Sequence, residues 1–125
     1  MVRCLISIII SLAIVIGGMF YENIFIRSTF DELNTMLDEV HLKLQEETAV
    51  ADDILAVQKF WITKKKQLHA LISHTEIKEV DLWISECVTY TKYKSFEDAE
   101  AKIEVVKELC EQIPKSYLLR FENIF

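Results

Sequence analysis

CLISIIISLAIVIGGMF, residues 4–20, carries no charged side chain in 17 positions. An α-helix rises about 1.5 Å per residue, so this segment reaches roughly 26 Å, close to the apolar thickness of a bilayer. Val2 and Tyr21 extend the helix by about a turn in all. We therefore predict a transmembrane helix over residues 1–21 and a separate domain over residues 22–125.

The flanks of this segment favour a signal anchor over a cleaved signal peptide. Arg3 and the amino terminus precede it, and bulky residues follow Gly17 and Gly18 where a cleavage site would need small ones. Acidic residues dominate soon after the segment, beginning with Glu22. The positive-inside rule then predicts that the N-terminus is cytoplasmic and that residues 22–125 are extracytoplasmic, on the outer side of the cytoplasmic membrane.

The composition of residues 21–125 restricts both fold and partner. This part carries 13 basic and 20 acidic side chains, a net charge of −7, which disfavours nucleic acid as a partner. The whole chain has one Pro and two Gly, and few turn-forming residues indicate helices. About 100 residues support one modest core.

Apolar residues recur at spacings of three and four through the rest of the chain, which predicts an all-α protein. The first helix should run through the membrane segment to about residue 47, and further helices should cover about 50–73, 76–93 and 96–113. Short connections predict antiparallel neighbours, in a helical bundle or stacked helical hairpins. The predicted core stripes contain Ile26, Phe30, Leu33, Leu37, Val40, Leu44; Val50, Ile54, Val57, Trp61, Leu68, Leu71; Ile77, Val80, Ile84, Cys87, Thr91; and Phe96, Ala99, Ile103, Val106, Cys110, Ile113.

Capping residues and a proline set the predicted ends of these helices. Thr75 is the expected N-cap of the third helix, and Ser95 begins a sequence close to a capping box. Pro114 is expected to end the fourth helix, because it has no N–H for the helix ladder. The apolar tail, residues 115–125, then forms a short C-terminal piece packed on the bundle.

The candidate chemical groups are few and widely spaced. Cys87 and Cys110 lie on apolar stripes and, in a hairpin turning near residues 94–95, too far apart for a disulfide. His69 and His74 are five residues apart, unlike the i, i+4 spacing of helical zinc ligands. No nucleophile, glycine-rich phosphate loop or metalloprotease motif is present. We therefore predict a non-catalytic protein with no metal and no cofactor.

One set of short features occurs in a recognisable order. After the apolar N-terminus come Trp61, His74-x-Glu76, Ile113-Pro114 and the terminal Glu-Asn-Ile-Phe. In these features the chain resembles a family of small single-pass membrane proteins from spore-forming Gram-positive bacteria, classed as a domain of unknown function. The resemblance implies a membrane-anchored helical protein and implies no activity.

Two functional hypotheses follow. The first is a membrane-tethered interaction or scaffold module that docks a protein partner through a groove between helices or through its apolar tail. The second is an extracytoplasmic sensor or carrier that binds a small ligand or ion within the bundle. The candidate interaction or turn-pinning residues are Trp61, His74, Glu76, Tyr117, Phe121 and Phe125. Ser7, Ser11 and Gly18 share one face of the membrane segment and are candidates for self-association into a homo-oligomer.

Overall fold

The computed structural model describes residues 1–124 of the chain, with side chains described through Leu118. Four α-helices make up this part: α1 (Val2–Gln45), α2 (Ala51–Leu68), α3 (His74–Lys92) and α4 (Phe96–Ile124). No strand occurs among the described residues. The predicted all-α fold is therefore confirmed, including the single long helix that begins at residue 2.

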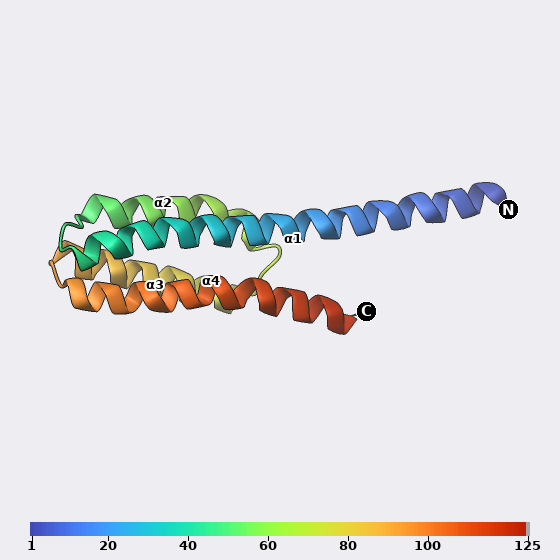
Figure 1. Ribbon diagram of the computed structural model, residues 1–125. Helices are drawn as coiled ribbons and strands as arrows, with labels where there is room; N and C mark the ends of the chain where they lie inside the picture. Colours follow the sequence, from blue (N-terminus) through green and yellow to red (C-terminus); the bar gives the residue numbers. More distant parts are fainter. Residues whose placement is uncertain (125) are drawn as a thin grey trace.

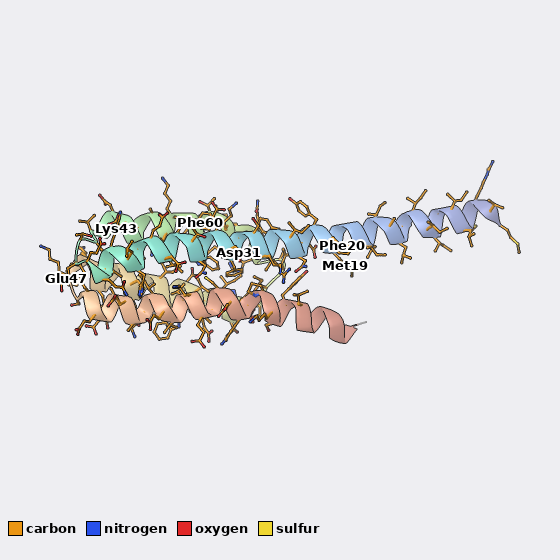
Figure 2. The ribbon with its side chains drawn as sticks, in the orientation of Figure 1. Met19, Phe20, Asp31, Lys43, Glu47 and Phe60 are labelled. Atoms are coloured by element: carbon orange, nitrogen blue, oxygen red, sulfur yellow. The ribbon has the colours of Figure 1, made fainter. Side chains whose placement is uncertain are left out.

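The helices form an antiparallel bundle from which one helix projects. α1 packs against α2 and α4, and α3 packs against the same two helices, so the four form a closed ring. Figure 1 shows the first half of α1 extending beyond the other helices, and the C-terminal end of α4 extending a shorter way in the same direction. In Figure 2, Met19 and Phe20 mark the region where α1 leaves the bundle, and Glu47 lies at the opposite end.

The core is formed where the four predicted apolar stripes meet, except that Val50, predicted in the second stripe, is the N-cap of α2 and is exposed. It is built from side chains that are almost wholly removed from solvent, each contributing about 1.5–3 kcal/mol when fully buried. The largest are Trp61, Phe30, Ile26, Leu33, Leu37, Leu44, Ile54, Leu68, Ile77, Ile84 and Ile103. The second half of α1 thus supplies one side of the bundle core, while its first half contributes nothing to that core.

Two tight turns close the far end of the bundle without glycine. Glu47 and Lys94 both have left-handed backbones, with φ of 57° and 60°. Each residue follows the end of a helix. The amide of Thr48 donates to the carbonyl of Lys43, and the amide of Ser95 donates to the carbonyl of Tyr90. These are 6→1 hydrogen bonds of the kind that end helices. They reverse the chain between α1 and α2 and between α3 and α4.

Several predicted boundaries are wrong. α2 ends at Leu68, because the amides of Leu71 and Ile72 both turn back to the carbonyl of Leu68. The N-cap of α3 is Ser73, whose hydroxyl accepts from the amide of Glu76, and not Thr75.

The predicted end at Pro114 is also wrong, since α4 continues to Ile124 and no separate C-terminal piece exists among the described residues. A proline removes one ladder hydrogen bond, and a helix continues through it where packing holds both sides. Ile113 is buried just before Pro114, and Tyr117 packs against the core just after it.

Candidate functional site

Trp61 is a structural contact between helices. Its ring is buried and lies 6.0 Å from the ring of Phe30 on α1. Its indole N–H donates to Oδ1 of Asp81 on α3 at 2.6 Å. Lys65 lies one turn further along α2, and its ammonium nitrogen forms an ion pair with Oδ2 of Asp81 at 3.2 Å. A ligand in the bundle would have to displace these contacts to reach Trp61.

The lysine triplet of α2 lies along this contact. Lys65 pairs with Asp81, and the ammonium of Lys64 lies 5.9 Å from the centre of the Phe25 ring on α1. Lys66 is exposed. The stems of Lys64 and Lys65 are half-buried, which is typical of lysines that cover an apolar surface and keep their charge near water.

His74 and Glu76 lie in the first turn of α3. The backbone amide of Glu76 donates a hydrogen bond to the hydroxyl oxygen of the N-cap, Ser73. The fold brings the His69 and His74 rings to within 5.4 Å of each other, although they are five residues apart in sequence. Among the side chains that the structure describes, through Leu118, no group of three or more His, Cys, Asp or Glu is arranged to hold a metal ion. His69 is the C-cap of α2 and His74 is the first residue of α3, so the two histidines lie on either side of the α2–α3 turn.

Tyr117 joins the end of α4 to α1. Its hydroxyl donates to Oε2 of Glu22 at 3.2 Å, across 95 residues of sequence. Partial burial, together with the neighbouring Glu22 carboxylate, raises the pKa of the Tyr117 phenol. The side chains of Phe121 and Phe125, the other two candidates in the tail, lie outside the described residues.

Both cysteines of the bundle are buried and free. Burial is the largest cause that raises the pKa of Cys87 to about 12 and the pKa of Cys110 to about 12. The thiol of Cys87 lies 3.8 Å from the carbonyl oxygen of Ala99. Cys110 is eleven residues further along α4, roughly 16 Å at helical rise. The two cysteines belong to different layers of the core.

Sequence reasoning missed a groove between α1 and α4. It has a volume of about 190 Å³ and combines charged and apolar side chains around the proline of α4. Its lining residues are Arg27, Phe30, Asp31, Asn34, Cys110, Glu111, Pro114, Lys115 and Leu118. The side-chain oxygen of Asn34 is buried there and has no hydrogen-bond partner. The sequence signal was Pro114 inside a helical pattern, which we interpreted as a helix end.

Sequence reasoning also missed the outer face of α2. Leu55, Lys59, Ile62 and Lys66 follow one another at spacings of four, three and four, and all are exposed. Leu55 is 41% exposed and Ile62 is 46% exposed. They form a second, outward-facing stripe on a helix whose inner stripe fills the core. The outer stripe has only two apolar residues, so its sequence signal is weaker than that of the inner stripe.

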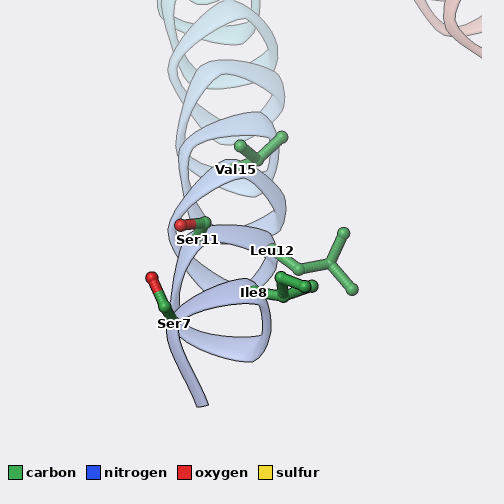
Figure 3. Close-up of a pocket in the computed structure, with 5 residues that line it drawn as sticks. All are labelled: Ser7, Ile8, Ser11, Leu12 and Val15. Atoms are coloured by element: carbon green, nitrogen blue, oxygen red, sulfur yellow. The ribbon is translucent and has the colours of Figure 1, made fainter. Parts of the chain in front are cut away.

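The apolar half of α1 is exposed along its whole length. An 18-residue window of this helix has a mean hydropathy of 2.5, and none of it is buried. Figure 3 shows the side chains of Ser7 and Ser11 on the same side of the helix, beside a shallow groove that also involves Ile8, Leu12 and Val15. Among the described residues, this is the one helix that is long and apolar enough to span a membrane.

Residues 20–124 match the family described as Domain of unknown function (DUF4363). The chain belongs to the DUF4363 family. The match covers the whole bundle and begins where the apolar segment of α1 ends. The DUF4363 description assigns no activity to any of the residues above. No curated protein and no solved structure matches the chain.

Proposed function

We propose that this protein is a single-pass membrane protein whose bundle serves as an interaction or scaffold module. The main support is the continuity of α1. One helix of 44 residues contains both an exposed apolar segment and one side of the bundle core. Ile8 and Leu12 are 64% and 59% exposed. Leaving so many apolar side chains in water is costly, and a bilayer removes that cost.

The proposal includes an orientation. Arg3 and the amino terminus lie on one side of the apolar segment, and the acidic bundle lies on the other. The positive-inside rule then favours an N-terminus in the cytoplasm and an extracytoplasmic bundle over residues 22–125. The resemblance to single-pass proteins of spore-forming Gram-positive bacteria supports the same arrangement in a cytoplasmic membrane.

We propose that the outer face of α2 is the docking surface. Leu55 and Ile62 offer two apolar contacts two turns apart, and Lys59 and Lys66 alternate with them. An amphipathic partner helix would place apolar side chains against the first pair and acidic side chains near the second. This mode of action needs no catalytic group, in keeping with the proposal that the protein is not an enzyme.

Site-specific photo-crosslinking in intact cells tests this proposal. A photoreactive side chain at Ile62 should give a discrete adduct with one partner protein. The same group at Glu104, which is exposed on α4, is the matched control and should give none. Equal yields at both positions, or no adduct at Ile62, would contradict docking through α2. An adduct with a second copy of the chain would replace the partner with a homo-oligomer.

A further inference from the structure

We propose that the last two turns of α4, residues 117–124, form a second contact with the same bilayer that holds α1. This inference rests on the proposed membrane span of α1. It adds a lipid-binding surface at the end of the bundle from which α1 projects.

The hydrogen bond between Tyr117 and Glu22 fixes the level of α4 along α1. The hydroxyl oxygen of Tyr117 and the carboxylate oxygen of Glu22 are 3.2 Å apart. Tyr117 therefore lies beside Glu22, two positions after the end of the apolar segment. The backbone of α4 continues as a helix for seven further residues, to Ile124. At about 1.5 Å per residue this carries it roughly 10 Å further.

The direction of that continuation is toward the membrane. α4 is antiparallel to α1, since Lys107 pairs with Asp38 and Tyr117 with Glu22. Each residue after Tyr117 is therefore further toward the N-terminal end of α1. Figure 1 shows the C-terminal end of α4 pointing in the same direction as the projecting half of α1, with the two ribbons diverging. The final turns of α4 therefore lie at the depth of residues 15–21 of α1, which the proposed span places in the outer part of the bilayer.

The sequence of these turns fits a membrane interface. Residues 117–124 read YLLRFENI, in which one Arg and one Glu interrupt an otherwise mostly apolar run. Tyrosine is frequent at the boundary between lipid and water, where Tyr21 of α1 also lies. An apolar run that is interrupted by charged residues in this way suits the headgroup and acyl boundary better than the centre of the bilayer.

The charge distribution along the bundle supports the same orientation. Residues 34–59 and 83–108, which form the far half, have a net charge of −6, whereas the half near the apolar segment has a net charge of −1. The near half contains Lys64, level with Phe25, and the exposed Lys66. The strongly acidic half is therefore held away from anionic headgroups, and lysines lie near them.

Depth-dependent fluorescence quenching tests the inference. In a Cys4→Ser background of the full-length chain, which keeps the buried Cys87 and Cys110, one added cysteine replaces Leu118, Ile9 or Glu104 and carries an environment-sensitive dye. The protein is reconstituted in vesicles of phosphatidylcholine and phosphatidylglycerol that contain nitroxide lipids. We expect shallow nitroxides to quench the dye at 118, deep nitroxides to quench it at 9, and neither to quench it at 104.

The outcomes separate the inference from the proposed function. Quenching at 9 without quenching at 118 would overturn the second contact and leave the anchor intact. The absence of quenching at both positions would overturn the membrane span as well. A dye at Ile124→Cys repeats the measurement at the last residue of α4. Quenching at 118 alone would contradict the span while retaining a lipid contact for α4.

Discussion

The indole N–H of Trp61 and the carboxylate of Asp81 form a 2.6 Å hydrogen bond that joins α2 to α3. Trp61 is 1% exposed, so its N–H has no access to water if this acceptor is lost. The ammonium of Lys65 donates to both oxygens of the same carboxylate, at 3.3 Å and 3.2 Å. The half-buried carboxylate of Asp81 thus accepts from the buried Trp61 N–H and pairs with Lys65. These contacts join α2 to α3.

We predict that Asp81→Ala lowers the free energy of unfolding by about 1–3 kcal/mol, because the Trp61 N–H is left buried without an acceptor. Asp81→Asn keeps an acceptor oxygen and should lose less. Chemical denaturation of the full chain in detergent micelles, followed by tryptophan fluorescence, measures both. Asp38→Ala is the control, since Asp38 forms a more exposed ion pair with Lys107 and should change stability by about 0–1 kcal/mol. Equal losses for Asp81→Ala and the control would contradict this account.

The bundle cysteines should be unreactive in the native state. A thiol with a pKa of about 12, against an ordinary value of about 9, carries roughly a thousandfold less thiolate at neutral pH. A water-soluble disulfide reagent should therefore modify Cys87 and Cys110 only after denaturant is added. The Cys4→Ser variant removes the exposed thiol and isolates the other two. Rapid modification in native buffer would show that the core opens at these positions.

Stability should fall in acid through the contact of Asp53 with Lys43. Asp53 accepts from the Lys43 ammonium at 2.8 Å and from the Val50 amide at 2.9 Å, which lowers the pKa of its carboxyl. A lowered folded-state pKa contributes stability above the unfolded value, near 4, and this is lost as pH falls through the folded value. Asp53→Asn should flatten that part of the unfolding profile. If the loss of stability at acid pH is the same in Asp53→Asn as in the unmodified chain, the contribution of Asp53 is contradicted.

The same contact acts in the opposite sense at high pH. The hydrogen bond and charge of Asp53 raise the pKa of Lys43. A raised folded-state pKa contributes stability below the unfolded value, near 10.5, and this is lost as pH rises through the folded value. Thermal unfolding of Lys43→Met should therefore differ from that of the unmodified chain least at strongly alkaline pH.

Pro114→Ala should stabilise α4. The substitution returns an N–H that can donate to the carbonyl of Cys110, four residues earlier, and it replaces the least favourable helix residue with the most favourable one. We expect a gain of about 1–3 kcal/mol in the free energy of unfolding, together with slower amide exchange in α4. Lys115→Ala is the neighbouring control and should change stability by about 0.5 kcal/mol or less. A loss on Pro114→Ala would show that the proline ring itself is needed for packing.

Local periodicity was sufficient to predict the core but not the contacts across it. The stripe from Ile26 to Leu44 is buried as predicted, because its spacing depends only on the helix period. Asp81 was not singled out, since nothing near it in sequence reveals that Trp61 lies opposite.

The candidate site residues were harder to predict than the fold. Pro114 was interpreted by its intrinsic preference, which packing of Ile113 and Tyr117 overrides. The bond from Tyr117 to Glu22 joins opposite ends of the chain, so it depends on the closure of the whole ring of helices. Such long-range pairs carry no local sequence signal.

The central claim is that α1 is retained in the membrane and holds the bundle outside the cytoplasm. Labelling of a Glu104→Cys, Cys4→Ser variant with a membrane-impermeant maleimide in intact cells tests it most directly, combined with alkaline extraction of the membranes. The account predicts that Glu104→Cys is labelled before lysis and that the labelled chain stays in the membrane pellet at its full length. Labelling only after lysis would contradict the orientation, and release of the chain into the alkaline supernatant would contradict the anchor.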